Sequence, residues 1–160
     1  MRQVWAAGLA ILTLPALCAC GPPVDIAKSV KIESVSTGWG AAGTVAGKNK
    51  VVPLASFTVK NVSTESLPSL QVNAVFHRNG EPGEWGTAFV TAAGRPGLTP
   101  GAEAQVTVKS QLGYTGIDPS DELLSNSQFV DATVDVFAKS GSVQWTHVGE
   151  FPIDHQLLVK

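Results

Sequence analysis

Apolar and polar residues alternate along much of the chain, which is the pattern of β-strands that bury one face. The clearest example is LQVNAVFHR at residues 70–78, where every second residue from Leu70 to Phe76 is apolar. The same alternation, complete or partial, recurs in segments 29–35, 51–61, 84–92, 104–110, 131–139 and 142–151. Stretches rich in Gly, Pro, Asn and Ser separate these segments and indicate turns. About seven short strands joined by polar turns predict an all-β fold, a two-sheet antiparallel β-sandwich.

The segment IDPSDELLSN interrupts this pattern and predicts one short helix near residues 118–125. Asp118 can cap the start of the helix, and Pro119 suits its first position. The acidic residues Asp121 and Glu122 complement the positive end of the helix dipole.

The first twenty residues, MRQVWAAGLAILTLPALCAC, differ in character from the rest of the chain. Arg2 supplies a positive charge, and an uncharged apolar stretch follows from Val4 to Leu17. This stretch is shorter than the roughly 20 residues that a membrane-spanning helix needs, and Pro15 would interrupt such a helix. The pattern predicts a signal segment.

The end of this segment, Leu17-Cys18-Ala19-Cys20, resembles the lipobox of bacterial lipoproteins. The resemblance implies that Cys20 carries acyl chains such as palmitate, and that cleavage before Cys20 removes Cys18 with the signal peptide. We therefore expect an exported protein that is lipid-anchored to the bacterial cell membrane. Gly21 in place of Asp favours the outer membrane if the envelope is Gram-negative. Two alternatives stay open, which are an uncleaved anchor helix and a soluble secreted protein.

This interpretation divides the chain into a signal peptide (1–19), a lipid-anchored tether (20–28) and a β-sandwich domain (29–160). The mature chain of 141 residues would carry 10 basic and 13 acidic residues, for a formal charge of −3. It has no basic cluster, so nucleic acid is not expected as a partner. Cys20 would be its one remaining Cys, so we expect no disulfide within the domain.

The stretch FTVKNVSTESLPSLQVNAVF, residues 57–76, looks like a motif of small extracytoplasmic bacterial domains. In those domains, which have immunoglobulin-like or fibronectin type III-like folds, a strand ends in Lys-Asn and a polar turn leads into an alternating strand. The resemblance implies an immunoglobulin-like sandwich. It brings no catalytic residue to this chain.

One glycine-rich segment, GWGAAG at residues 38–43, has the G-x-G-x-x-G spacing of dinucleotide-binding loops. The residues that follow it, TVAGKNKVVP, do not predict the helix whose N-terminus would face the phosphates. We expect a flexible loop here, and no cofactor.

The titratable residues do not predict a catalytic or metal site. The three histidines fall on separate strands or near the end of the chain, so we expect no shared metal ion. Asp131 and Asp135 would lie about 13 Å apart along one strand, on a solvated face.

Four aromatic residues are the candidates for contact with a partner or ligand. Trp39 is expected in the glycine-rich loop, Tyr114 in the segment LGYTGIDP, and Trp85 at the start of a strand. Phe137 should face away from the apolar residues on either side of it. Aromatic residues in loops on a rigid scaffold often bind partners. The alternative, which we favour, is that bulky loop aromatics close the ends of the sandwich core.

Together these features predict a non-catalytic binding or structural module of the bacterial cell envelope that acts through protein–protein contacts. Its partners would be the membrane, through Cys20, and an envelope protein. A second hypothesis is a carrier or sensor of a small ligand that uses Trp39, Trp85 and Tyr114. A third, less favoured, is an enzyme whose site involves His77, His147 or His155.

Overall fold

The structure is a computed structural model that describes residues 24–159. The expected signal peptide (1–19) and the lipidation site Cys20 lie outside the described residues. No helix within residues 24–159 is long and apolar enough to cross a membrane.

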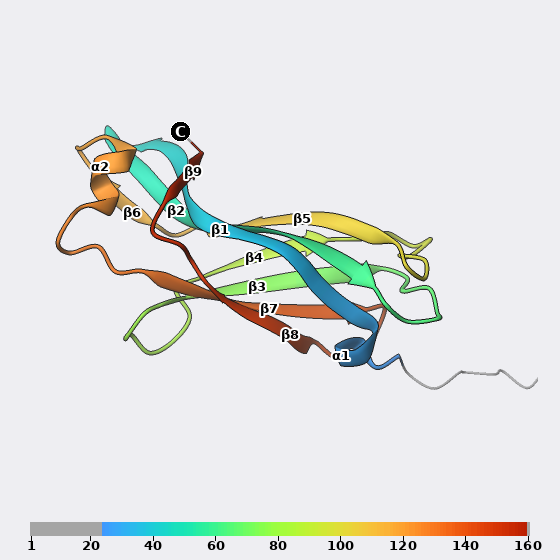
Figure 1. Cartoon of the computed structure of the whole chain (residues 1–160). Helices are drawn as coiled ribbons and strands as arrows, with labels where there is room; N and C mark the ends of the chain where they lie inside the picture. Colours follow the sequence, from blue (N-terminus) through green and yellow to red (C-terminus); the bar gives the residue numbers. More distant parts are fainter. Residues whose placement is uncertain (1–23, 160) are drawn as a thin grey trace, which may run out of the picture.

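Two β-sheets pack face to face (Figure 1). The first sheet has the strand order β5-β2-β1-β9, and β6 also pairs with β2. Its five strands are β1 (Val30–Val45), β2 (Lys48–Asn61), β5 (Glu103–Lys109), β6 (Tyr114–Gly116) and β9 (Leu157–Val159). The second sheet has the order β4-β3-β7-β8, with β3 (Leu70–Arg78), β4 (Gly86–Thr91), β7 (Ala132–Ser140) and β8 (Thr146–Pro152). All pairs are antiparallel except β1 with β9. The predicted two-sheet sandwich is confirmed.

The strand order is that of an immunoglobulin-like domain. Lettered along the chain as A, B, C, C′, E, F and G, the strands β1, β2, β3, β4, β5, β7 and β8 form the sheets A-B-E and C′-C-F-G. This is the immunoglobulin arrangement without a strand D. Strands β6 and β9 are additions at one end of the first sheet.

Alternation along the strands places the core between the sheets. In β7 the side chains of Ala132, Val134, Val136 and Ala138 are fully buried, and the residues between them are half-buried. The apolar positions of β3 face the same core, including Phe76 with no exposed surface. Burial of such side chains is the main source of stability for a domain of this size.

A buried asparagine organises the turn after β2. Asn61 has no exposed surface, and its Nδ2 donates hydrogen bonds to the carbonyl oxygens of Glu65 and Leu98, both at 2.7 Å. Its Oδ1 accepts hydrogen bonds from the backbone N–H and the hydroxyl of Ser63. The Lys-Asn strand end noted in the sequence therefore has a structural purpose, because one side chain satisfies the polar groups of the turn.

The glycine-rich segment 38–43 is not the flexible loop that we expected, because β1 runs through it. Two of its glycines, Gly38 and Gly40, are needed for close packing within the sheet. A Cβ atom on Gly38 would lie 2.6 Å from Leu158 Cγ, and one on Gly40 would lie 2.5 Å from Leu54 Cδ2. Small residues at these positions let neighbouring side chains cross the strand.

Two short helices cover the ends of the sandwich. Helix α2 (Ser120–Leu124) confirms the predicted helix, and its last two residues, Leu123 and Leu124, are buried. Asp118 does not cap it; Pro119 occupies the N-cap position and no side chain caps the helix.

Helix α1 (Ile26–Ser29) was not predicted, since a single turn carries no periodic signal. It lies at the far end of the molecule from α2 (Figure 1). Ile26 is buried in the core, so the packed domain begins before residue 29, within the segment expected to be tether.

Charged residues on the first sheet form a small exposed network. Lys60 Nζ lies 2.8 Å from Glu103 and 3.9 Å from Glu33. The pKa of Lys60 is raised chiefly by its hydrogen bond to Glu103, and the pKa of Glu33 is lowered chiefly by its hydrogen bond from Lys31. Because water screens exposed pairs, these contacts contribute little to stability.

The role of Asn61 can be tested by substitution. Asn61→Ala removes the hydrogen bonds that the side chain makes with Glu65, Leu98 and Ser63 at a fully buried position. We therefore expect the free energy of unfolding to fall by about 3 kcal/mol. The control is Asn73→Ala on β3, since the Asn73 side chain makes no hydrogen bond within residues 24–159; it should change stability by less than about 0.5 kcal/mol. Urea denaturation measures both, and equal effects would contradict this role of Asn61.

Candidate functional site

The structure brings three of the four predicted aromatic residues together at the end of the sandwich that α2 covers. Ring centroids lie 6.1 Å apart for Trp39 and Trp85, 5.7 Å for Trp39 and Tyr114, and 5.2 Å for Trp85 and Tyr114. Phe129, from the segment after α2, joins them at 4.5 Å from Trp39 and 4.7 Å from Tyr114. We call these four residues the aromatic cluster.

Trp39 is the fully buried base of the aromatic cluster. It lies in strand β1 rather than in a loop, and it has no exposed surface. Its indole Nε1 is buried without a hydrogen-bond partner among the described residues. Trp39 therefore packs at this end of the core, as in the alternative stated from the sequence.

Arg78, the last residue of β3, covers the aromatic cluster. Its guanidinium lies 5.6 Å from the centre of the Trp85 ring and 5.3 Å from that of Tyr114, within the range of cation–π contacts. Arg78 Nε donates a hydrogen bond to the Tyr114 hydroxyl at 2.9 Å, and its NH1 is 3.1 Å from Glu81. The Tyr114 hydroxyl also accepts from the N–H of Val130 and donates to its carbonyl. These contacts fix the ring of Tyr114.

Glycines on both sides of Tyr114 allow β6 to pack closely. A Cβ atom on Gly113 would collide with the carbonyl oxygen of Val51 in β2, and one on Gly116 would collide with Leu123 of α2. The LGYTG sequence therefore holds Tyr114 between β2 and α2.

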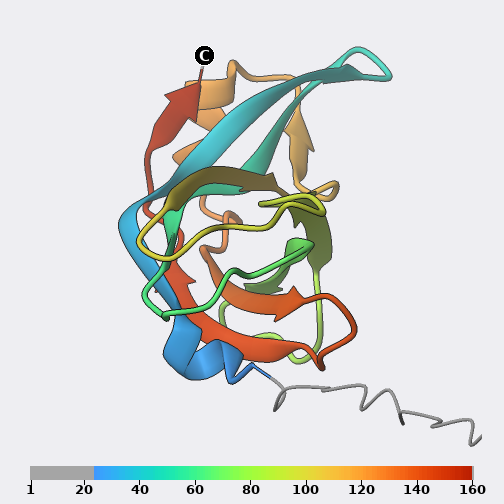
Figure 2. The same cartoon turned by 90° about the vertical axis from the view of Figure 1, so that its right-hand side faces the viewer.

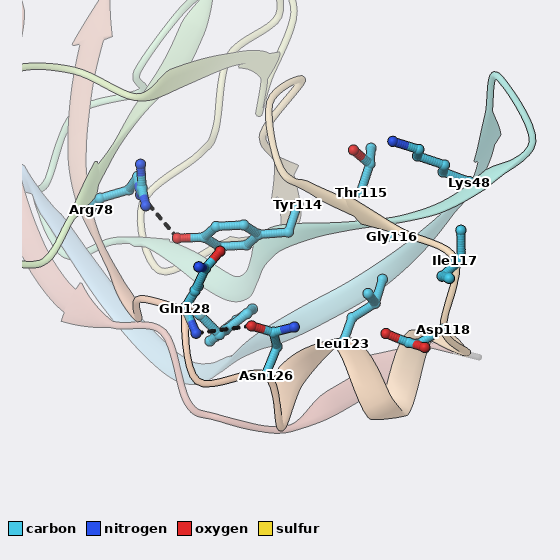
Figure 3. A pocket seen from close by; sticks show the side chains of 11 residues that line it. Lys48, Arg78, Tyr114, Thr115, Gly116, Ile117, Asp118, Leu123, Asn126 and Gln128 are labelled. Atoms are coloured by element: carbon cyan, nitrogen blue, oxygen red, sulfur yellow. Dashed lines mark hydrogen bonds between the residues drawn. The ribbon is translucent and has the colours of Figure 1, made fainter.

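A pocket of about 610 Å³ opens beside Tyr114 and Phe129 (Figure 3). Arg78 and Lys48 lie at opposite ends of it, and α2 and the β6–α2 connection form one side. Its remaining lining residues are Thr115, Gly116, Ile117, Asp118, Leu123, Asn126 and Gln128. Trp39 and Trp85 support this pocket from behind but are not among its lining residues.

The lining combines aromatic rings, apolar side chains, amides, two cations and the carboxylate of Asp118. Lys48 makes no ion pair with any residue in the range 24–159. Asn126 Oδ1 accepts a hydrogen bond from the backbone N–H of Gln128, which orders this rim of the pocket. Such a surface can hold an apolar group against the rings while its polar rim binds carbonyl or carboxylate oxygens.

The sequence did not predict Arg78, Lys48 and Phe129 as site residues. Arg78 is only the end of an alternating strand in the sequence, and Lys48 lies in the segment that follows the glycine-rich residues 38–43. Phe129 lies in an irregular segment with no periodic pattern. Their approach depends on strand pairing, which alternation does not specify.

Phe137 lies apart from the aromatic cluster, on the outer face of the second sheet. It faces away from the fully buried Val134 and Val136, as predicted. Its ring is half-buried and lies 5.2 Å from that of His147, edge to face. Phe137 therefore cannot act in the same site as Tyr114.

The histidines are paired with the aspartates that were expected to be merely solvated. His77 Nε2 is 3.2 Å and His147 Nε2 is 2.7 Å from the carboxylate of Asp135, and His155 Nδ1 is 2.8 Å from Asp131. Strand register explains the Asp135 contacts, because β7 lies between β3 and β8. Within residues 24–159, no three His, Cys, Asp or Glu side chains are placed to hold a metal ion.

The position of Tyr114 can be tested through Gly113. Gly113→Ala forces β6 away from Val51, so we expect a loss of about 1–3 kcal/mol in stability and weaker near-ultraviolet circular dichroism from the aromatic cluster. Gly94→Ala is the control, because a Cβ there meets its nearest atom, Pro96 Cδ, at 3.8 Å. An aromatic spectrum unchanged by Gly113→Ala would contradict the close packing of β6.

Comparisons with known proteins give only distant similarities. No protein-family model and no curated protein matches the chain. One similar solved structure is target SoR45 of the Northeast Structural Genomics Consortium, 14% identical, with a TM-score of 0.46 over 81% of this chain and 89% of that chain. Another is the ligand binding region of serine-glutamate repeat protein A of Enterococcus faecium, 17% identical, with a TM-score of 0.32 over 80% and 98%. Similarity at this level carries no inference about function.

Proposed function

We propose that the protein is a lipid-anchored, extracytoplasmic binding module of the bacterial envelope that acts through protein–protein contacts rather than by catalysis. The anchor in this proposal rests on the sequence, in which a charged start and an apolar stretch precede Leu17-Cys18-Ala19-Cys20. Acyl chains on Cys20, with cleavage before it, would provide a stable attachment.

The observation that carries the proposal is the position of the pocket relative to the start of the domain. The described chain enters the sandwich through α1, at one end, which we call the anchored pole. The pocket is lined by residues of α2 and β6. Figures 1 and 2 show these two elements at the opposite end, which we call the distal pole. A lipid on Cys20 would thus hold the anchored pole at the bilayer and present the pocket away from it.

The distal pole has features suited to a protein partner. Ile117 lines the pocket and is 80% exposed, and Val45, at the tip of the β1–β2 hairpin, is 50% exposed. Lys48 lies beside them with its ammonium free of any ion pair in the described part of the chain. Exposed apolar residues around a concave, polar-rimmed site are typical of contact surfaces.

Membrane anchoring would raise the effective concentration of this module toward partners at the same surface. Even a weak contact at the distal pole would then suffice for function, because binding to a co-localised partner becomes nearly intramolecular. The outer membrane would be the site if the envelope is Gram-negative.

A second candidate is a carrier or sensor of a small ligand. It is favoured by the pocket volume of about 610 Å³, which is within the range of small-molecule sites. Tyr114 and Phe129 would then contact the ligand directly.

Site-specific crosslinking in intact cells tests the leading candidate. Replacing Ile117 with photo-reactive benzoyl-phenylalanine should give a discrete protein adduct after illumination. The matched control is the same replacement at Val62, which is 49% exposed but lies next to α1 at the anchored pole. Adducts of only bulk envelope proteins, or the same adducts from both positions, would contradict a partner at the distal pole.

The small-ligand candidate predicts a different result. A low-mass envelope extract should change the tryptophan emission of the purified protein, because Trp85 contacts Tyr114 at the pocket. Tyr114→Ala should abolish this change. An extract that leaves the emission unaltered would reject the carrier hypothesis.

A further inference from the structure

A second aromatic surface lies on the outer face of the four-stranded sheet. Trp145, which precedes β8, reaches Phe89 of β4, and their ring centroids are 6.0 Å apart in an edge-to-face arrangement. Trp145 is 38% and Phe89 57% exposed. Lys139 Nζ lies 4.8 Å from the centre of the Trp145 ring. We call Phe89, Lys139 and Trp145 the outer patch.

The outer patch lies toward the anchored pole. Strand β7 ends at Ser140, and the turn 141–145 that carries Trp145 follows at the same end of the sandwich as α1 (Figures 1 and 2). Hydrogen bonds link this turn region to α1 through the β2–β3 connection. Ser140 Oγ donates to the carbonyl of Pro68, and the N–H of Val62 donates to the carbonyl of Ser29 in α1.

The short tether limits how far this pole can be from a membrane, if Cys20 is acylated as proposed above. Four Cα–Cα steps separate Cys20 from Val24, so the two residues can be at most about 14 Å apart. Pro22 and Pro23 fall within this tether. An acylated chain must therefore keep the start of α1 next to the bilayer surface, and the neighbouring side chains within reach of lipid headgroups.

We propose that the outer patch contacts the interfacial region of the lipid bilayer and sets the tilt of the domain on the membrane. The indole of Trp145 is favourable at the level of the headgroups because the ring can be buried while its N–H stays hydrated. The phenyl ring of Phe89 adds apolar surface that the interface can bury. Lys139 adds an attraction to anionic headgroups, and it makes no ion pair within the residues that the structure describes. In this orientation the pocket at the distal pole stays clear of the bilayer.

Fluorescence quenching by lipid tests the contact directly. The acylated protein, purified from its native membrane, is reconstituted into phosphatidylcholine–phosphatidylglycerol vesicles with and without brominated acyl chains. The mature chain would contain Trp39, Trp85 and Trp145, of which Trp39 is fully buried and Trp85 lies at the distal pole. We expect brominated lipid to quench part of the emission in the wild type, and this quenching to disappear in Trp145→Phe. Trp85→Phe is the matched control and should retain it.

Two results would overturn the proposal. Quenching that is equal in Trp145→Phe and the wild type would place the outer patch away from lipid, as would an acylated protein without any quenching. Metabolic labelling with an alkyne fatty acid separates this failure from that of the anchor. A labelled but unquenched protein rejects only the membrane contact, whereas an unlabelled protein rejects the anchor and the tether limit together.

Discussion

The burial of Trp39 is the interaction on which the distal end of the molecule depends. Its ring comes from the middle of β1, and it contacts Trp85, Tyr114 and Phe129, which belong to three other segments. The rings of the aromatic cluster fill this end of the sandwich beneath β6 and α2. The pocket depends on this packing, since Tyr114 and Phe129 contact Trp39 and also line the pocket. Contact with a fully buried tryptophan restricts the side chains of the pocket, and a site held in this way would lose little entropy on binding.

The alternation of apolar and polar residues predicted the strands well, but it did not predict which strands pair. Alternation identified β3 and β7 because each has one face in the core, and the acidic start after Pro119 identified α2. It failed for residues 38–43, because the glycines that usually mark a loop are here required for packing inside β1. The local pattern also did not predict that Asp135 contacts His77 and His147, because these contacts depend on the register of β7 with β3 and β8. For the same reason the sequence could name Trp39, Trp85 and Tyr114 but could not show that they meet.

The proposals assign membrane anchoring to one end of the domain and partner binding to the other. Helix α1 and the outer patch lie toward the anchored pole, where a short chain leads back to Cys20. The pocket and the exposed side chain of Ile117 lie at the distal pole. In the proposed arrangement, anchoring and recognition would use opposite ends of one sandwich, so a partner would be bound without competition from the membrane. Both proposals depend on the acylation of Cys20, which makes that modification the central claim.

The intact mass of the protein extracted from its native membrane tests this claim most directly. The account predicts the mass of residues 20–160 plus acyl chains, and loss of those chains in Cys20→Ala. A full-length mass, or a chain cleaved elsewhere with a free thiol at Cys20, would contradict it. A full-length chain would make residues 1–19 a membrane helix that anchors the domain without acyl chains. A cleaved chain with a free thiol would make them an ordinary signal peptide, and acyl chains would then not hold the anchored pole at the bilayer.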